Sequence, residues 1–523
     1  MQRAVRVLLA AVMTMAGAAT ARGQDLAVED PVLQRMWTLG MDSSRTWDLA
    51  QTLLDSVGPR LTGTPLLKRG NDWLVSMYQQ WGIEARNEQY GTWRGWDRGF
   101  THVDLIQPRV RTLEATLLAW SDGTRGRPVE GKVVLLPEAA DSAALQRALP
   151  SLKGAFVLAS MPELTCRAQD NIDEFGTPET VEKLEQAREE QSDAWSARMR
   201  ATGLNTTALH DALAAAGVRG ILTSRWSRGW GVNKIFGTRV ENVPVLDVSC
   251  EDYGLLWRLA EQDQGPMLRV AAEGKDLGEV PVYNTIAVIP GSEKPDEYVM
   301  LSAHFDSWDG SSGATDNGTG SIVMLEAMRI LKQAYPQPKR TIVVGHWAGE
   351  EQGLNGSRAF MADHPEIVKG LQALFNQDNG TGRVVRMSGA GLIDAGGFLG
   401  RWLARVPEDI TRHIDLSVPG TPAGGGSDNA SVACYGAPGF SLGSISWDYG
   451  TYTWHTNRDS FDKVMFDEIR SNATLTAMLV YLAAEDPDFM PRERRVMPVG
   501  RDGEQRTWPE CVTPARASGE STR

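Results

Sequence analysis

Short apolar runs alternate with helical patterns along the second half of the chain. Residues 298–303 are almost continuously apolar, which is typical of a strand covered on both faces, and residues 341–344 and 371–375 form two further runs of this kind. Residues 321–333 carry apolar side chains around much of a helical circumference, as in a buried helix. This alternation predicts strands joined by helices, and therefore a parallel α/β sheet.

A different pattern precedes this region, between residues 112 and 280. Apolar runs at 131–136, 155–158 and 220–223 indicate short buried strands. Between them lies a charged helical segment, for which Thr177 is a suitable N-cap before a proline. We expect a small β-rich domain with a helical excursion, inserted into a larger fold.

The first residues have the pattern of an export signal. Arg3 and Arg6 precede the apolar run 7–13, and the small residues that follow end in Ala-Thr-Ala at 19–21. The apolar run is short for a helix that spans a bilayer. We therefore expect a secreted or periplasmic protein with no stable membrane insertion. An uncleaved N-terminal anchor is the alternative.

Composition narrows the class of protein. Of the 523 residues, 42% are hydrophobic and 23% are charged, as in an ordinary globular enzyme, and the length favours two domains or one domain with a large insert. The net charge of -13, without a stripe of Lys and Arg, argues against nucleic-acid binding. The four cysteines form no C-x-x-C pair. Disulfides and buried free thiols both remain open.

Residue types that bind metals gather at the predicted strand ends. In open α/β sheets, ligands bind beyond the carboxyl ends of the strands. The residues at those ends, or in loops that can return to them, are His304, Asp306, Asp316, Glu350, Glu351, Asp378 and His455. Each alone has an ordinary explanation, such as a turn or a helix start. It is the recurrence across five separate loops that predicts one metal site.

The donor set favours zinc. Two histidines and three carboxylates suit this borderline ion. A single structural zinc needs four ligands and no open position, whereas five ligands beside a spare carboxylate suit two ions that share one bridging carboxylate. Three carboxylates against two divalent ions leave about one positive charge, which a bridging hydroxide would neutralise. His346, inside a predicted strand, is expected to be a core histidine.

Four motifs carry a family resemblance. They are residues 304–309 (HFDSWD), 313–320 (GATDNGTG), 350–357 (EEQGLNGS) and 454–456 (WHT). Together they resemble peptidase family twenty-eight of the zinc exopeptidases, in its carboxypeptidase Q-like branch. The resemblance implies an α/β fold with a mixed, largely parallel sheet flanked by helices, and an inserted β-rich domain of the protease-associated type.

The resemblance also implies the metal ligands. Asp316 would bridge two zinc ions. His304 and Asp378 would complete one site, and Glu351 and His455 would complete the other.

Further roles follow from the same resemblance. Glu350 would be the general base, and Asp306 would support the ring of His304. The family uses a side-chain donor for the oxyanion, for which Tyr449 and Tyr452 are candidates, and the loop 424–428 resembles one near the substrate.

The expected organisation has five segments. Residues from 491 onward are rich in Arg, Pro, Gly and Ser, which predicts a loosely attached tail. The segments are a signal peptide (1–21), the N-terminal part of a peptidase domain (30–111), the inserted domain (112–280), the metal-binding part of the peptidase domain (281–488) and a C-terminal tail (489–523).

The expected function is zinc-dependent hydrolysis of short peptides near a chain end. A metal-bridged water would attack, Glu350 would act as general base, and the enzyme would be an aminopeptidase or a dipeptidase. The alternatives are a carboxypeptidase acting on short peptides, a non-catalytic receptor-like protein on the same fold, and a single-zinc cyclising transferase. Short peptides are the expected partners, and a homodimer is one candidate assembly.

Overall fold

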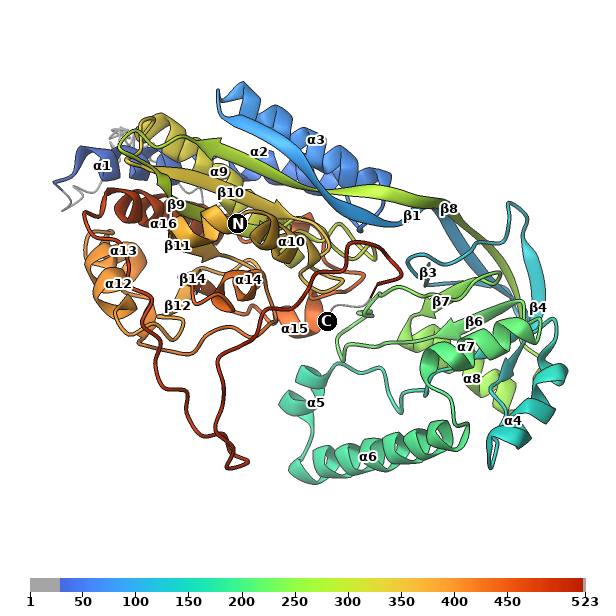
Figure 1. Ribbon diagram of the computed structural model, residues 1–523. Helices are drawn as coiled ribbons and strands as arrows, with labels where there is room; N and C mark the ends of the chain where they lie inside the picture. The colour runs from blue at the N-terminus through green and yellow to red at the C-terminus, as the bar shows by residue number, and fades with distance from the viewer. Residues whose placement is uncertain (1–28, 521–523) are drawn as a thin grey trace, which may run out of the picture.

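Two lobes are joined by a long two-stranded ribbon, which crosses the top of the protein in Figure 1. The structure, a computed structural model, describes residues 29–520, so the predicted signal peptide lies outside the described residues. The ribbon consists of β1 (Glu84–Gln107) and β8 (Met267–Ile289), which pair antiparallel along most of their length. One end of β8 joins the sheet of the larger lobe and the other end joins the smaller lobe, so both lobes share one continuous strand.

The larger lobe contains the predicted α/β sheet. In order across the sheet, its strands are β14 (Gly439–Ser441), β11 (Leu371–Asn376), β9 (Lys294–His304), β10 (Arg340–Trp347) and the end of β8. The first four are parallel, and β8 runs antiparallel to β10. The expectation of a mixed, largely parallel sheet is confirmed.

Helices cover both faces of this sheet. Side chains alternate along a strand, so Val299 and Leu301 of β9 face α9 (Thr319–Ala334) and α16 (Phe466–Glu485), whereas Met300 packs on the opposite side. That opposite side is covered by α10 (Asn355–Asp363), α11 (Pro365–Gly370) and α14 (Ala430–Ala433). Residues 298–303 are largely apolar on both faces for this reason. Within residues 29–520, no helix is both long and apolar enough to cross a membrane.

The N-terminal helices complete the larger lobe. They are α1 (Pro31–Trp37), η1 (Thr38–Asp42), α2 (Thr46–Gln51), η2 (Thr52–Val57) and α3 (Pro65–Gln80). Thr64 begins α3, because its hydroxyl accepts a hydrogen bond from the backbone N–H of Leu67 and a proline follows it. The short loop between η2 and α3 is thereby directed across the end of β9, where it meets the candidate site.

The remaining elements of this lobe form its outer rim. A small sheet contains β12 (Val384–Ser388), β13 (Asp415–Ser417) and β15 (Gly443–Ser444). The accompanying helices are α12 (Ala395–Leu403), α13 (Glu408–Thr411), α15 (Tyr449–Tyr452) and η5 (Phe461–Lys463).

The smaller lobe is built around four parallel strands. These are β4 (Val129–Leu135), β5 (Phe156–Leu158), β6 (Gly220–Thr223) and β7 (Val245–Val248), and they include all three strands expected from the sequence. On the far edge, β3 (Ala115–Leu117) pairs antiparallel with β7, and β2 (Arg111–Leu113) pairs with β1. The helices are α4 (Ser142–Ala148), η3 (Leu149–Leu152), α5 (Gln169–Phe175), α6 (Pro178–Ala201), α7 (Thr206–Ala215) and α8 (Cys250–Glu261). Thr177 caps α6, as expected.

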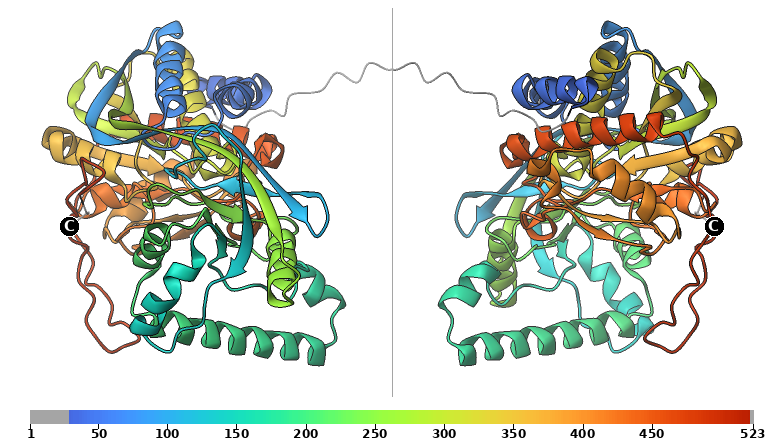
Figure 2. Two further views of the ribbon diagram at one scale, coloured as in Figure 1. Left: turned by 90° about the vertical axis from the view of Figure 1, so that its right-hand side faces the viewer. Right: turned by 90° about the vertical axis from the view of Figure 1, so that its left-hand side faces the viewer.

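The C-terminal segment differs from the expectation of a loosely attached tail. Figure 2 shows it as a long strap on the outside of the protein. It is fastened by a disulfide between Cys434 and Cys511, and by Ala515, which is buried and donates its backbone N–H to Asn355 Oδ1 at 2.9 Å. A second disulfide joins Cys166 to Cys250, so all four cysteines are paired. The sequence does not indicate these attachments, because the segment is polar and the residues that fasten it are few and far apart.

Candidate metal centre

The predicted ligands converge on one edge of the larger sheet. His304 is the last residue of β9, and Asp378 follows β11. Glu351 follows β10, and Asp316 lies in the turn η4 (Ala314–Gly318) that enters α9. Because β9, β10 and β11 are parallel, their carboxyl ends open onto the same edge. His455, from the loop after α15, returns to this edge from the far side of the lobe.

The five side chains form two overlapping groups of three. His304, Asp316 and Asp378 make one group, and Asp316, Glu351 and His455 make the other; within each group the ligand atoms lie within 4.8 Å of one another. The Nε2 atom of His304 is 3.4 Å from Asp316 Oδ1, and the Nε2 atom of His455 is 3.1 Å from Asp316 Oδ2. The two oxygens of Asp316 therefore face different groups.

This arrangement fits a pair of divalent cations. His304 Nε2 is 3.2 Å from Asp378 Oδ1, and His455 Nε2 is 2.9 Å from Glu351 Oε2, so each imidazole faces two carboxylates. Glu351 Oε1 is buried and has no hydrogen-bond partner among residues 29–520. Burial, followed by the charge of Asp316, raises the pKa of Glu351 to about 8. A buried excess of carboxylates with an unpaired oxygen is the environment that a bound cation stabilises.

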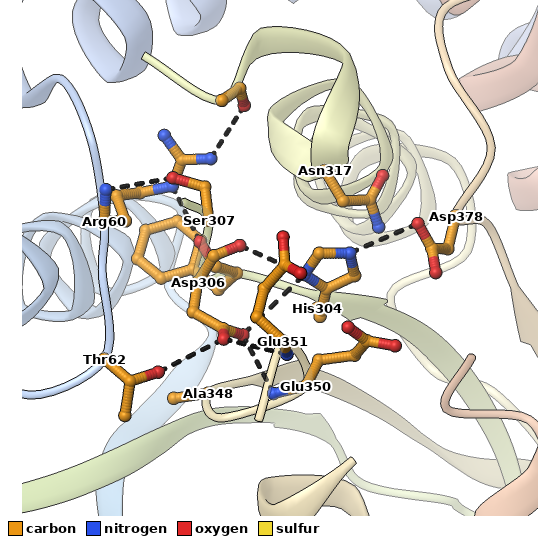
Figure 3. A network of polar contacts seen from close by, with 12 residues as sticks. Arg60, Thr62, His304, Asp306, Ser307, Asn317, Ala348, Glu350, Glu351 and Asp378 are labelled. Carbon is orange, nitrogen blue, oxygen red and sulfur yellow. Dashed lines mark hydrogen bonds and ion pairs between the residues drawn. The ribbon is translucent and has the colours of Figure 1, made fainter. Parts of the chain in front are cut away.

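Glu350 lies beside this set but belongs to neither group. It precedes Glu351 at the end of β10, and Figure 3 shows its side chain pointing toward Asp378. Burial raises the pKa of Glu350 well above its usual range, while His304 acts in the opposite direction. A carboxylate that is close to the ligands and is not one of them can accept and return a proton.

Asp306 supports the site in a different manner from the one expected. Its carboxylate accepts hydrogen bonds from the backbone N–H groups of Glu350 and Glu351, each at 3.2 Å, and from the Thr62 hydroxyl, also at 3.2 Å (Figure 3). The ring of His304 is held chiefly by the backbone carbonyl of Asp306, 3.0 Å from Nδ1, whereas the Asp306 carboxylate is 3.7 Å away. Asp306 thus fixes the backbone that carries both glutamates.

Asp459 is a supporting residue that sequence reasoning missed. It is buried, and its carboxylate accepts the backbone N–H groups of Thr315 at 2.8 Å and of Asp316 at 3.0 Å. Burial raises the pKa of Asp459 to about 7. Its position four residues after His455 is the only signal in the sequence, and an isolated aspartate in a loop is too common to be informative.

Arg60 was also missed, although it connects three parts of the site. Fully buried, it donates from Nε to the Phe305 carbonyl at 2.7 Å, and from its two terminal nitrogens to the Ser312 and Gly313 carbonyls at 2.8 and 2.9 Å. Phe305 follows β9, and Gly313 precedes the turn with Asp316. The planar guanidinium therefore fixes the distance between the loops that carry His304 and Asp316 (Figure 3).

Replacing Arg60 with lysine is expected to destabilise the protein by about 2–4 kcal/mol, because an ammonium group cannot reproduce the fork of hydrogen bonds to buried carbonyls. Urea unfolding with and without added zinc measures this change, and metal affinity should fall with it. Arg35→Lys, at an exposed position on α1, is the matched control. Equal unfolding midpoints for the two variants would contradict the role given to Arg60.

Three other residues considered from sequence have distinct environments. His346 is fully buried and bonded to the Tyr78 hydroxyl at 2.7 Å, and burial lowers its pKa to about 3, as suits the expected core histidine. The Tyr452 hydroxyl is occupied by Asp170 at 2.6 Å. Burial, and then the charges of Asp316 and others, raise the pKa of Tyr449 well above its usual range, so its hydroxyl stays a donor.

Comparison with known proteins agrees with this fold. Residues 284–480 match the model of Peptidase family M28. The match spans the strands β9, β10 and β11 and all five predicted ligands. It confirms the expected resemblance and, together with the relatives described next, the expected enzyme class: the chain is a hydrolase of the metallopeptidase type, and an exopeptidase.

The particular relatives are exopeptidases by name. The chain is 25% identical to carboxypeptidase Q of Rattus norvegicus over 453 residues, which cover 87% of this chain and 88% of that protein. Leucine aminopeptidase 1 of Ajellomyces capsulatus is 32% identical over 219 residues, 38% of this chain and 55% of that protein.

Solved structures share the fold. A Peptidase M28 precursor from Shewanella amazonensis has a TM-score of 0.63 at 23% identity, covering 91% of this chain and 98% of its own. A zinc aminopeptidase from Bacillus subtilis has a TM-score of 0.53 at 18% identity, covering 86% and 96%. The first of these spans both lobes and the ribbon between them.

Proposed function

We propose that this protein is a zinc-dependent exopeptidase that holds two zinc ions and hydrolyses short peptides. The observation that supports this most is the pair of histidine–carboxylate groups joined through Asp316, with Glu350 beside them. His304 and Asp378 would hold one ion, Glu351 and His455 the other, and Asp316 both. Bound there, zinc supplies a water of lowered pKa and polarises the scissile carbonyl.

The residues of the chain supply the proton transfers and the positioning. Glu350 accepts the proton of the attacking water and returns it to the nitrogen of the leaving amine. Asp306 keeps Glu350 in place through its backbone N–H, and Asp459 does the same for Asp316. We propose Tyr449 as the donor to the developing oxyanion, because its hydroxyl is protonated and Tyr452 is engaged elsewhere.

We further propose that the protein is exported and that residues 112–280 form the inserted domain. Two disulfides, Cys166–Cys250 and Cys434–Cys511, suit an oxidising compartment.

The inserted domain also supports the candidate metal site: the backbone N–H of Ile235 donates to the carbonyl of His455 at 2.7 Å. His455 has a positive φ of 59°, which a non-glycine residue adopts only when its surroundings hold it there.

Removal of metal is the direct test of this function. Dialysis against a chelator should abolish hydrolysis of short unblocked peptides, and zinc should restore it with a stoichiometry of two ions per chain, because each group lacks its charge-neutralising cation after dialysis. Metal content is measured by elemental analysis alongside the rate of peptide hydrolysis. Undiminished hydrolysis by metal-free protein would overturn the proposal, and so would zinc binding without any peptidase activity, which a receptor would show.

A further inference from the structure

A cavity of about 800 Å³ lies between the smaller lobe and the metal edge of the larger one. From the metal side it is lined by Trp308 and Gln352, the second of which directly follows the candidate ligand Glu351. From the smaller lobe it is lined by Phe236, Thr238 and Arg225. The volume exceeds that of one amino-acid residue, and the cavity is bordered by both lobes.

Phe236 both lines the cavity and contacts a candidate metal ligand. The ring of Phe236 is 5.2 Å from the ring of His455 and 5.3 Å from that of Trp308, in edge-to-face contacts. The guanidinium carbon of Arg225 lies 4.9 Å from the centre of the same Phe236 ring. Because the two distances share the Phe236 centroid, Arg225 lies within about 10 Å of the His455 ring.

The two residues that line this space at the metal end carry polar atoms without partners. Trp308 Nε1 and both amide atoms of Gln352 are buried and make no hydrogen bond within the described chain. Unsatisfied buried polar groups are rare in folded proteins because each one costs free energy. The same three atoms offer donors and an acceptor suited to the amide and carboxylate groups of a peptide.

Arg225 brings a positive charge that also acts on a buried acid of the smaller lobe: burial raises the pKa of Asp247 to about 7, and the charge of Arg225 acts in the opposite direction. Among residues 29–520 the side chain of Arg225 forms no ion pair, whereas Arg94, which also borders the cavity, is 3.7 Å from Asp276. Glu520, on the exposed rim, accepts a hydrogen bond from the backbone of Arg516. The acidic Glu241 is likewise exposed at the rim. The guanidinium of Arg225 is exposed, lies over an aromatic ring and has no ion-pair partner in the described part of the chain, which suits it to bind a carboxylate.

We propose that this cavity takes the residue on the carboxyl side of the scissile bond, and that Arg225 binds the free α-carboxylate of that residue. One extended residue spans about 3.5 Å. With a contact distance added at each end, a single residue can therefore extend from the metal edge to Arg225, which lies within about 10 Å of the His455 ring. The preferred substrates are then dipeptides with a free carboxyl end. This inference rests on the proposed peptidase function and assigns its substrate class.

The test compares a dipeptide with its C-terminal amide. The native enzyme should favour the free dipeptide by at least about tenfold in kcat/KM. Arg225→Gln should lower kcat/KM for the free dipeptide by roughly 10- to 100-fold, mainly through KM, since a hydrogen bond to a charged group contributes about 1.5–3 kcal/mol. The same variant should change hydrolysis of the amide by less than about threefold. Arg225→Lys should recover part of the loss.

Arg228→Gln is the matched control, because Arg228 is an exposed arginine on the same loop that lines a different hollow. It should leave both substrates unaffected. If the native enzyme cleaves the amide as well as the free dipeptide, or if Arg225→Gln slows both equally, Arg225 does not recognise the carboxylate.

A binding measurement separates this inference from the proposed function. N-acetylleucine should quench the fluorescence of the tryptophans that line the cavity, which include Trp308, more strongly than N-acetylleucinamide does. Arg225→Gln should abolish that difference. This readout needs no turnover, so a protein that hydrolyses no peptide yet shows the Arg225-dependent difference refutes only the peptidase proposal. Equal binding of both compounds by the native protein refutes the carboxylate site.

Discussion

Replacing Glu350 with glutamine is expected to lower kcat for peptide hydrolysis by about 10³-fold or more while leaving both proposed metal sites intact. General acid–base catalysis by one positioned side chain contributes typically 10²–10⁴-fold. The amide of glutamine has nearly the same shape as the carboxylate but cannot accept the proton of the attacking water. Glu350 belongs to neither ligand group, so the variant should retain the metal content of the native protein.

The neighbouring glutamate provides the contrast for this experiment. Glu351→Gln makes the same chemical change one residue further along, where Glu351 Oε2 is 2.9 Å from His455 Nε2. This variant should lose activity together with bound metal, because an amide is a weaker zinc ligand than a carboxylate. Rates and metal content measured on the same samples distinguish the two roles. Retention of a tenth or more of native activity by Glu350→Gln would show that another group moves the proton.

Much of the larger lobe could be predicted because its local patterns agree with its tertiary structure. The strand at 298–303 is apolar on both faces because helices cover both, and the helix at 321–333 is apolar around its circumference because β9 and α16 enclose it. Parallel strands place their carboxyl ends together, so residues following separate strands could be assigned to one site without knowledge of the loops between them.

The supporting residues could not be predicted in the same way. Arg60 and Asp459 act through backbone groups of distant segments, 245 and 144 positions away for their closest contacts. Nothing near either residue in the sequence marks such a contact. Asp306 was recognised, but its main partners proved to be backbone N–H groups rather than the ring of His304. Sequence patterns identify residues whose side chains have suitable chemistry. The hydrogen-bond partners of those side chains depend on how the chain packs.

The connection between the two lobes could likewise not be predicted from the sequence. β8 is one strand of 23 residues that crosses the expected domain boundary at 280, and its middle carries exposed polar residues where it joins neither sheet. A pattern that changes along a single strand resembles two strands separated by a loop. The cavity beside Arg225 depends on this ribbon, because β1 and β8 connect the smaller lobe to the metal edge.

Replacing Asp316 with alanine is expected to lower bound zinc from the proposed two ions to fewer than one and to abolish activity. Asp316 is the only residue common to both ligand groups of the described chain, with Oδ1 toward His304 and Oδ2 toward His455. Its loss therefore removes a ligand from each site and one negative charge from between two cations. Elemental analysis of the purified variants, with circular dichroism to verify folding, gives the measurement.

The decisive comparison is between this shared ligand and an unshared one. His455→Ala removes a ligand from only one group and should leave close to one ion per chain, held by His304, Asp316 and Asp378. Asp247→Ala is the control for the general effect of losing a buried carboxylate. Asp247 lies in the smaller lobe, where it is bonded to Asn233, and this variant should retain both ions. If Asp316→Ala and His455→Ala retain the same amount of zinc, the two sites do not share Asp316, and the proposed bridging geometry is wrong even if the enzyme is a metallopeptidase.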